Sequence, residues 1–84
     1  LPIDSIKIDA SFVREIETDA AIPTTIIALA RCMGLGVVAE GVETQAQADK
    51  LLTLGCEVMQ GHAYGAPMPA SRLESLIRQR YVSQ

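Results

Sequence analysis

A short apolar strand that leads into two carboxylates and a helix start is the feature that most constrains this chain. Residues 37–39 read Val-Val-Ala, a run too short and too β-branched to favour a helix. Glu40 and Glu43 follow, with a glycine between them. Thr44 then precedes Gln47 by three residues, which is the spacing of a helix-capping box. We therefore predict a buried strand that ends at Glu40 and a helix that begins at Thr44.

The position of Glu40 at the end of this strand marks it as a candidate site residue. A carboxylate at the end of a buried strand loses part of its hydration. This lowers the stability of the fold unless a neighbouring cation, metal ion or substrate interacts with the carboxylate. The alternative is that Glu40 and Glu43 are ordinary loop carboxylates near the start of a helix. The pattern by itself leaves both interpretations open.

Segments typical of strands alternate with segments typical of helices along the whole chain. The predicted strands span residues 5–9, 36–40 and 57–60, and the predicted helices span 11–16, 22–33, 44–54 and the stretch from 71 onward. Ser11 and a capping box over 71–74 are the expected caps of the first and last helices. Three βα units in a row predict an α/β fold with a parallel sheet covered by helices.

Apolar residues at helical spacing identify the faces that we expect to be buried. These residues are Ile22, Ile26, Ala30 and Met33 in the second helix, Ala48, Leu51 and Leu52 in the third, and Leu73, Leu76 and Ile77 in the last. Gly34 and Gly55 follow two of these helices and are expected to end them.

Composition narrows the class of protein. The 84 residues are 49% hydrophobic, more than so short a soluble domain needs, and the chain starts at Leu1 without an initiator Met, so we expect a piece of a larger protein. A net charge of −3 with seven scattered basic residues argues against a nucleic-acid surface.

Cys32 and Cys56 lack the spacing of metal ligands and are interpreted as buried thiols in a reducing compartment. No apolar run approaches the roughly 20 residues that cross a bilayer.

Three polar residues fall at or near the carboxyl ends of the three predicted strands. They are Lys7, Glu40 and Gln60. In parallel α/β proteins this edge of the sheet is where ligands bind, so we expect the three side chains to share one site. Each has a simpler interpretation: Lys7 could extend into solvent from an edge strand, and Gln60 could hold the loop over 61–69 by hydrogen bonds.

Other polar residues and the methionines are weaker candidates. Asp9 is expected to cap its own turn or form a salt bridge, although a catalytic role stays open. His62 fits a loop or packing role better than that of a ligand. Met33, Met59 and Met68 are interpreted as core or loop filler.

These motifs together resemble a known family. The resemblance is carried by residues 1–9, 11–13, 37–44, 55–61 and 67–69, which follow in order the C-terminal part of the EAL domain. That family comprises bacterial cyclic di-GMP phosphodiesterases. The resemblance implies that residues 1–84 are the last three units of a TIM-like (β/α)8 barrel, with its N-terminal half absent.

The resemblance also implies a reaction and roles for particular residues. The reaction is hydrolysis of cyclic di-GMP to linear pGpG, assisted by Mg²⁺ or Mn²⁺. Lys7 matches a lysine beside the attacking water, and Glu40 matches a glutamate that supports the second metal or acts on that water. Gln60 matches a glutamine that orients water, and Glu43 matches a second acid that positions the loop.

Departures from the family pattern leave two functions open. The other metal ligands, including paired aspartates, belong to the missing N-terminal part, so the chain alone is expected to be inactive. Residues 65–67 read Gly-Ala-Pro where the family often has a basic residue. The chain could therefore belong to a working phosphodiesterase or to a degenerate EAL domain that binds cyclic di-GMP or a protein partner. The chain retains Lys7, Glu40 and Gln60 together, which favours a working phosphodiesterase over a degenerate domain.

The resemblance further implies partners and a location. The expected partners are cyclic di-GMP, the rest of the EAL barrel or another copy of the chain, and sensory or GGDEF-type domains in the parent protein. No nucleic acid is expected. The expected location is cytoplasmic, with any membrane anchor lying in an upstream region.

Overall fold

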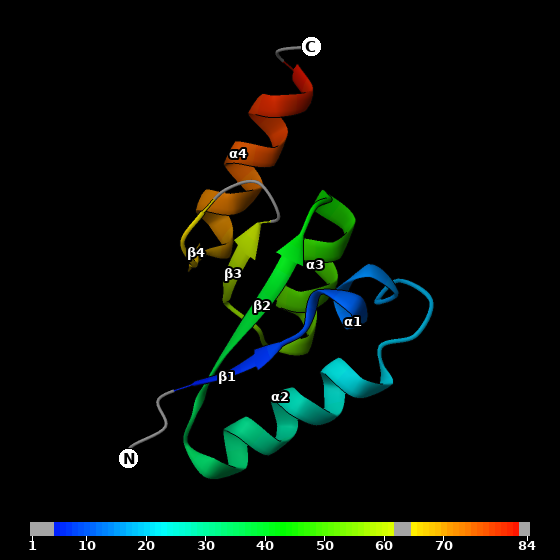
Figure 1. The fold of residues 1–84 in the computed structure, drawn as a ribbon, viewed down its shortest axis with the longest axis vertical. Helices are drawn as coiled ribbons and strands as arrows, with labels where there is room; N and C mark the ends of the chain where they lie inside the picture. The colour runs from blue at the N-terminus through cyan, green and yellow to red at the C-terminus, as the bar shows by residue number, and fades with distance from the viewer. Residues whose placement is uncertain (1–4, 62–64, 83–84) are drawn as a thin grey trace.

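The computed structural model describes residues 5–61 and 65–82 of the chain, and the elements in these ranges alternate between strands and helices (Figure 1). They are β1 (Ser5–Ile8), α1 (Ala10–Arg14), α2 (Ala21–Met33), β2 (Gly36–Val42), α3 (Gln45–Leu54), β3 (Val58–Gly61), β4 (Met68–Pro69) and α4 (Ala70–Val82). The predicted order of three βα units is confirmed. In the described part of the chain, no helix has both the length and the apolar character needed to cross a membrane.

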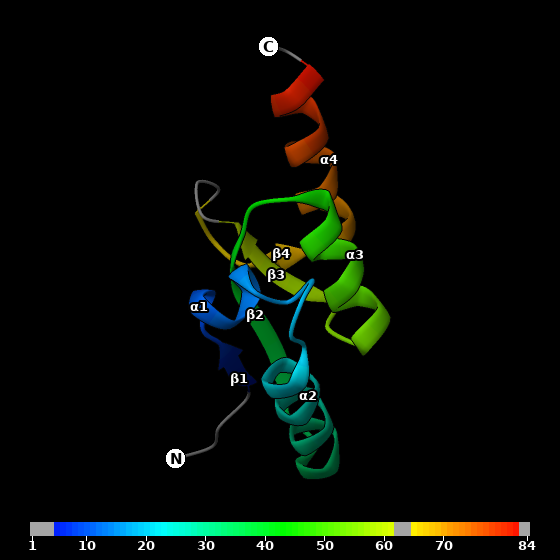
Figure 2. The same ribbon diagram turned by 90° about the vertical axis from the view of Figure 1, so that its right-hand side faces the viewer.

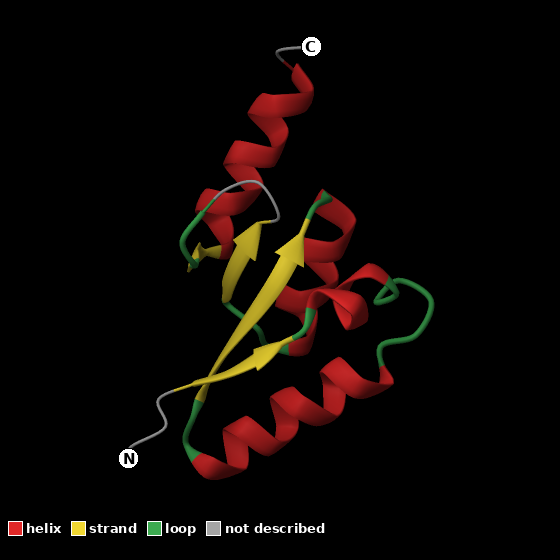
Figure 3. Cartoon of the chain, viewed as in Figure 1, coloured by secondary structure: helices red, strands yellow, loops and turns green. Residues whose placement is uncertain are grey.

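The strands form one sheet in the order β1-β2-β3-β4. The first three are parallel, with Ile8 opposite Ala39 and Ala39 opposite Met59 (Figure 3). The two-residue strand β4 is antiparallel to β3 and was not predicted, because so short a strand carries no alternating pattern. Pro69 lacks a backbone N–H, which suits the edge position that β4 occupies.

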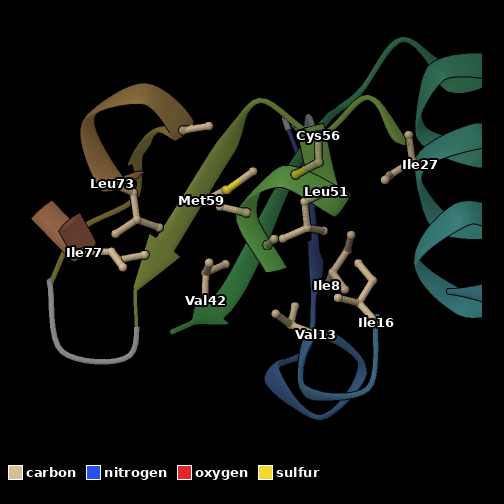
Figure 4. Packing of buried hydrophobic residues seen from close by; sticks show 13 residues of the cluster. Ile8, Val13, Ile16, Ile27, Val42, Leu51, Cys56, Met59, Leu73 and Ile77 are labelled. Atoms are coloured by element: carbon tan, nitrogen blue, oxygen red, sulfur yellow. The ribbon is translucent and has the colours of Figure 1, made fainter. Parts of the chain in front are cut away.

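The helices α2, α3 and α4 lie on the same side of the sheet (Figure 2). The core fills the space between these helices and the strands (Figure 4). The sheet contributes Ile8, Ala39 and Met59 to it, and Leu51 and Leu73 are among the helical residues, all of them fully buried. The short helix α1 lies apart from these three helices, beside β2 (Figure 2).

Local signals in the sequence correctly place several helix ends. Thr44 and Gln47 form the predicted capping box at the start of α3. Gly34 ends α2 with a φ of 69°, and Gly55 ends α3 with a φ of 105°. These φ values lie in the left-handed region, which glycine adopts without a steric penalty.

The predicted buried faces of α2 and α3 are partly wrong. Pro23, Ile27 and Ala30 are the buried residues of α2, whereas Ile22 is exposed and Met33 is 59% exposed. Leu52 of α3 is also exposed, although Ala48 and Leu51 are buried as expected. The reason is that α2 is apolar on more than one side, so spacing alone does not identify the side that meets the sheet.

Ser11 does not cap α1 and the predicted capping box over 71–74 does not begin α4, whereas the expectation that Asp9 caps its own turn is confirmed. Asp9 caps α1, because its Oδ2 accepts a hydrogen bond from the Ser11 N–H at 3.0 Å. The helix α4 begins at Ala70, whose N–H donates to the carbonyl oxygen of Glu57 at 2.8 Å. Ser71 therefore lies inside the first turn of α4, and the hydrogen bond to Glu57, the residue before β3, holds the chain at the start of the helix.

The two cysteines lie in different environments. Cys56 is a buried thiol, as predicted, and burial raises its pKa. Cys32 is exposed, which contradicts the expectation that both thiols are buried. Cys32 lies on the exposed side of α2. The prediction was wrong because this helix is apolar on more than one side, so an apolar neighbourhood in the sequence does not indicate burial.

Candidate functional site

Lys7 and Glu40 lie side by side on neighbouring parallel strands. The Lys7 Nζ is 3.7 Å from the Glu40 Oε2, and the two side chains are 63% and 32% exposed. The pairing of Lys7 with Val38 places Glu40 two residues further along β2, which brings the two side chains to the same end of the sheet. The expected proximity of these residues is therefore confirmed.

The face of the sheet that carries this pair is the one opposite the core. Side chains alternate along a strand, and residues paired across strands point to the same side. The register then assigns one set of residues to a surface that we call the open face: Lys7, Val38, Glu40, Val58 and Gln60. Val58 is partly exposed there, so the open face combines apolar side chains with polar ones near the carboxyl ends of the strands.

Gln60 is paired with Glu40 across β2 and β3. Its Nε2 donates a hydrogen bond to the Gly65 carbonyl oxygen at 2.6 Å. This is the loop-holding interaction that the sequence left open for Gln60. The contact fixes Gly65, which follows the carboxyl end of β3, whereas His62 lies outside the described residues.

The strand β2 continues past Glu40 to Val42, although we expected it to end at Glu40. The register shifts between Glu40 and Val42, because Glu40 pairs with Gln60 while Val42 pairs with Gly61. Gly41 is the extra residue of this β-bulge and has a φ of 72°. Glu40 precedes the bulge and lies on the open face, and the bulge brings Val42 into the core, where it is fully buried.

The bulge at Gly41 was not predicted from the sequence. The signal for it was a glycine between two carboxylates, which we placed between the predicted strand and the predicted helix. A bulge depends on the register with the next strand, so its position cannot be read from residues 36–44 alone.

Glu43 is exposed and follows the bulge. The Gln47 Oε1 accepts hydrogen bonds from the N–H groups of Glu43 at 2.8 Å and Thr44 at 3.2 Å. The Thr44 Oγ1 in turn accepts one from the Gln47 N–H at 3.1 Å. The backbone of Glu43 is thus held by Gln47, and its carboxylate has no hydrogen bond or ion pair with another described residue.

Asp9 serves as a helix cap. Its Oδ2 accepts hydrogen bonds from the Ser11 N–H at 3.0 Å and the Ser11 Oγ at 2.6 Å. These two bonds lower the pKa of the Asp9 carboxyl group. Asp9 lies two residues beyond Lys7, so the cap is close in sequence to the site.

The described residues do not form a metal site by themselves. No group of three or more His, Cys, Asp or Glu side chains in residues 5–61 and 65–82 is placed to hold an ion. Glu40 offers one carboxylate, and hard divalent ions require about six oxygen ligands. What the pair can supply is a cation to stabilise negative charge and a carboxylate to accept a proton or provide one metal ligand.

Comparisons with known proteins agree on one family. The family model described as "EAL domain" matches residues 1–67. MucR from Pseudomonas aeruginosa, a bifunctional diguanylate cyclase/cyclic di-GMP phosphodiesterase, is 49% identical over 76 residues, which are 87% of this chain and 11% of MucR. The cyclic di-GMP phosphodiesterase PdeL from Escherichia coli is 46% identical over 77 residues, 88% of this chain and 21% of PdeL.

A solved structure has the same local fold. The structure of PaMucR phosphodiesterase in complex with c-di-GMP matches 87% of this chain with a TM-score of 0.70 and 49% identity. The match covers 31% of that chain. The 84 residues therefore span only a small part of the relatives that they resemble.

Proposed function

Because the chain belongs to the EAL domain family, whose barrel is TIM-like, we propose that it forms the C-terminal three units of a barrel that hydrolyses cyclic di-GMP. The proposed product is linear pGpG, and the proposed metal is Mg²⁺ or Mn²⁺. The observation that carries the proposal is the Lys7–Glu40 pair on the open face, at the carboxyl ends of parallel strands. In such folds this edge is where substrates bind.

The two charged residues would act on the attacking water and the phosphate. The Lys7 ammonium group would stabilise negative charge that develops near the phosphodiester, since fixed cations do this without reorganisation. Glu40 would orient the water and accept its proton, or bind the second metal. Gln60 would orient water through its Oε1 while its Nε2 holds Gly65, and Glu43 would help to position the loop after β2.

A bound divalent ion would neutralise phosphate charge and make water a better nucleophile. Glu40 is the residue of this chain that would contribute a ligand, and one carboxylate does not fit such an ion alone. The remaining ligands would come from the part of the EAL domain that precedes these residues. We therefore propose that the 84 residues alone do not hydrolyse cyclic di-GMP.

Two bare surfaces support the proposal that further barrel units adjoin this chain. Strand β1 is at one edge of the sheet, and its outer side is unpaired among the described residues. Helix α2 exposes Ile22, Leu29 and Met33 along one side. A preceding βα unit would place a strand on β1 and a helix on α2, and the rest of the barrel would cover the open face.

Partners of the whole protein are part of the same proposal. They are cyclic di-GMP and sensory or GGDEF-type domains of the kind implied by a bifunctional relative such as MucR. The proposed location is cytoplasmic.

Substitution of Glu40 in the longer protein tests the function. Glu40→Ala should lower kcat far more than it raises KM, because a group that acts on water contributes mainly in the transition state. Glu17→Ala removes an exposed carboxylate that is not part of the Lys7–Glu40 pair and is the matched control.

Three results would count against the proposal in different ways. An unchanged kcat for Glu40→Ala would give Glu40 a structural role. Tight binding of cyclic di-GMP without hydrolysis by the unmodified protein would favour a sensor. Turnover by the isolated chain, abolished by Glu40→Gln, would show that the other units are not needed.

A further inference from the structure

Gly41 and Ala10 approach each other closely where β2 ends and α1 begins. Gly41 is buried, and its φ of 72° lies in the left-handed region. A Cβ atom at position 41 would lie 2.5 Å from the Ala10 Cβ and 3.2 Å from the Ala10 Cα. Ordinary contacts begin at 3.4 Å, so a side chain at position 41 would have to push α1 away by about 1 Å. Both the backbone and the space therefore require glycine.

Both residues are close in sequence to the charged pair. Gly41 directly follows Glu40, and Ala10 is three residues beyond Lys7. The connection from β1 to α1 is stiff, because Asp9 binds both the N–H and the Oγ of Ser11. The α1 residue Val13 is fully buried, which limits how α1 can shift without moving the end of β1.

The bulge at Gly41 also determines which side of the sheet the chain presents directly after Glu40. Glu40 lies on the open face through its regular pairing with Gln60, and the extra residue after it brings Val42 into the core. β-Bulges are frequent at the rims of barrels and beside active sites, where they redirect side chains. Gly41 therefore combines two tasks, since it brings Val42 into the core directly after Glu40 and lets α1 pack against the end of β2.

From these contacts we propose that Gly41 is a positioning residue, which sets the separation of Lys7 and Glu40 by its contact with Ala10. Its catalytic consequence rests on the proposed phosphodiesterase function. The contact itself is independent of that function. A larger group on either side of the contact would separate the ends of β1 and β2 and move the ammonium group away from the carboxylate.

Two alanine variants separate this steric effect from backbone strain. Gly41→Ala introduces both a positive φ for alanine and the clash with Ala10. Gly34→Ala is the matched control, because Gly34 has a φ of 69° and a Cβ atom added there would have no neighbour within 4 Å among the described residues. Gly34 ends α2 and is not part of the site.

In the longer protein, Gly41→Ala should lower kcat by about 100-fold with little change in KM, since a displacement of about 1 Å has that effect on a reacting arrangement. Gly34→Ala should keep the kcat of the unmodified protein. Adding Ala10→Gly to Gly41→Ala removes the closest clashing atom and should restore at least part of the lost kcat. Equal kcat for Gly41→Ala and Gly34→Ala, or no recovery in the double variant, would overturn the proposal.

A second variant applies if Gly41→Ala does not fold. Ala10→Val enlarges the opposing side chain and leaves the backbone of residue 41 unchanged, so it should produce the same selective loss of kcat. An unchanged kcat in Ala10→Val would overturn the proposal.

Crystal structures of the variants give a readout that does not need activity. The distance between the Cα atoms of Lys7 and Glu40 should increase in Gly41→Ala or Ala10→Val and stay the same in Gly34→Ala. An unchanged distance in the first two variants would refute the positioning role. If the unmodified protein proves inactive, the proposed function fails, and this distance alone decides the inference.

Discussion

Replacing Gln47 by methionine should loosen the segment that follows Glu40. Gln47 is 7% exposed, and its Oε1 accepts two hydrogen bonds, from the N–H groups of Glu43 and Thr44. Methionine has a similar length but lacks this acceptor. The Gln47 N–H would still donate to the Thr44 Oγ1, so α3 should keep its first turn.

The expected magnitude follows from the two hydrogen bonds that are lost. A buried hydrogen bond contributes about 1 kcal/mol, so the two together contribute about 2 kcal/mol. With a tenfold change for each 1.4 kcal/mol, hydrogen exchange of the Glu43 and Thr44 amides should become roughly 30-fold faster. The exchange rates can be measured residue by residue by NMR on the domain that contains this chain.

Gln45→Met is the matched control on the same helix. The Gln45 Nε2 donates to the Asp49 Oδ1 at 3.1 Å in an exposed pair, which is worth only about 0.3 kcal/mol. Exchange at Glu43 and Thr44 should therefore hardly change in this variant. Unchanged exchange in Gln47→Met, or an equal acceleration in both variants, would refute the assignment of this role to the Gln47 side chain.

Three further predictions concern association, packing and pH. The isolated chain should self-associate in light scattering, because the described residues leave the open face and the outer edge of β1 uncovered; a stable monomer at micromolar concentration would contradict this. In the intact domain, Leu51→Ala should cost about 3 kcal/mol in urea unfolding and Leu52→Ala less than about 1, since only Leu51 is fully buried; equal losses would count against this core assignment. The lowered pKa of Asp9 means that its stabilising contribution is present above its usual pKa of 3.8 and is lost as pH falls through the lower folded value. The stability of Asp9→Asn should not show this loss when the pH is lowered. Identical pH profiles of stability for the variant and the unmodified protein would contradict this role of Asp9.

Features set by residues close together in sequence could be predicted. The capping box of Thr44 and Gln47 and the glycine that ends α3 involve partners within a few residues. Their patterns are therefore visible without a structure. The alternation of strands and helices was visible for the same reason, and the parallel sheet followed from the connections between them.

Part of the candidate site could also be predicted. A parallel sheet places the carboxyl ends of its strands at one edge, so Lys7 and Glu40 were expected to meet, and their ion pair confirms it. The catalytic roles of these residues remain predictions. The hydrogen bond from Gln60 to Gly65 selects a contact that the sequence left open.

Features that depend on distant partners were decided only by the tertiary structure. The side of α2 that meets the sheet, marked by Ile27, was not distinguishable from the side of Met33, because both are apolar and packing alone separates them. The N–H of Ala70, the first residue of α4, finds its hydrogen-bond partner at Glu57, thirteen residues earlier in the chain. The bulge at Gly41 depends on its register with β3 and its contact with Ala10, so the sequence determined which residues reach the site, and tertiary packing determined how they are held there.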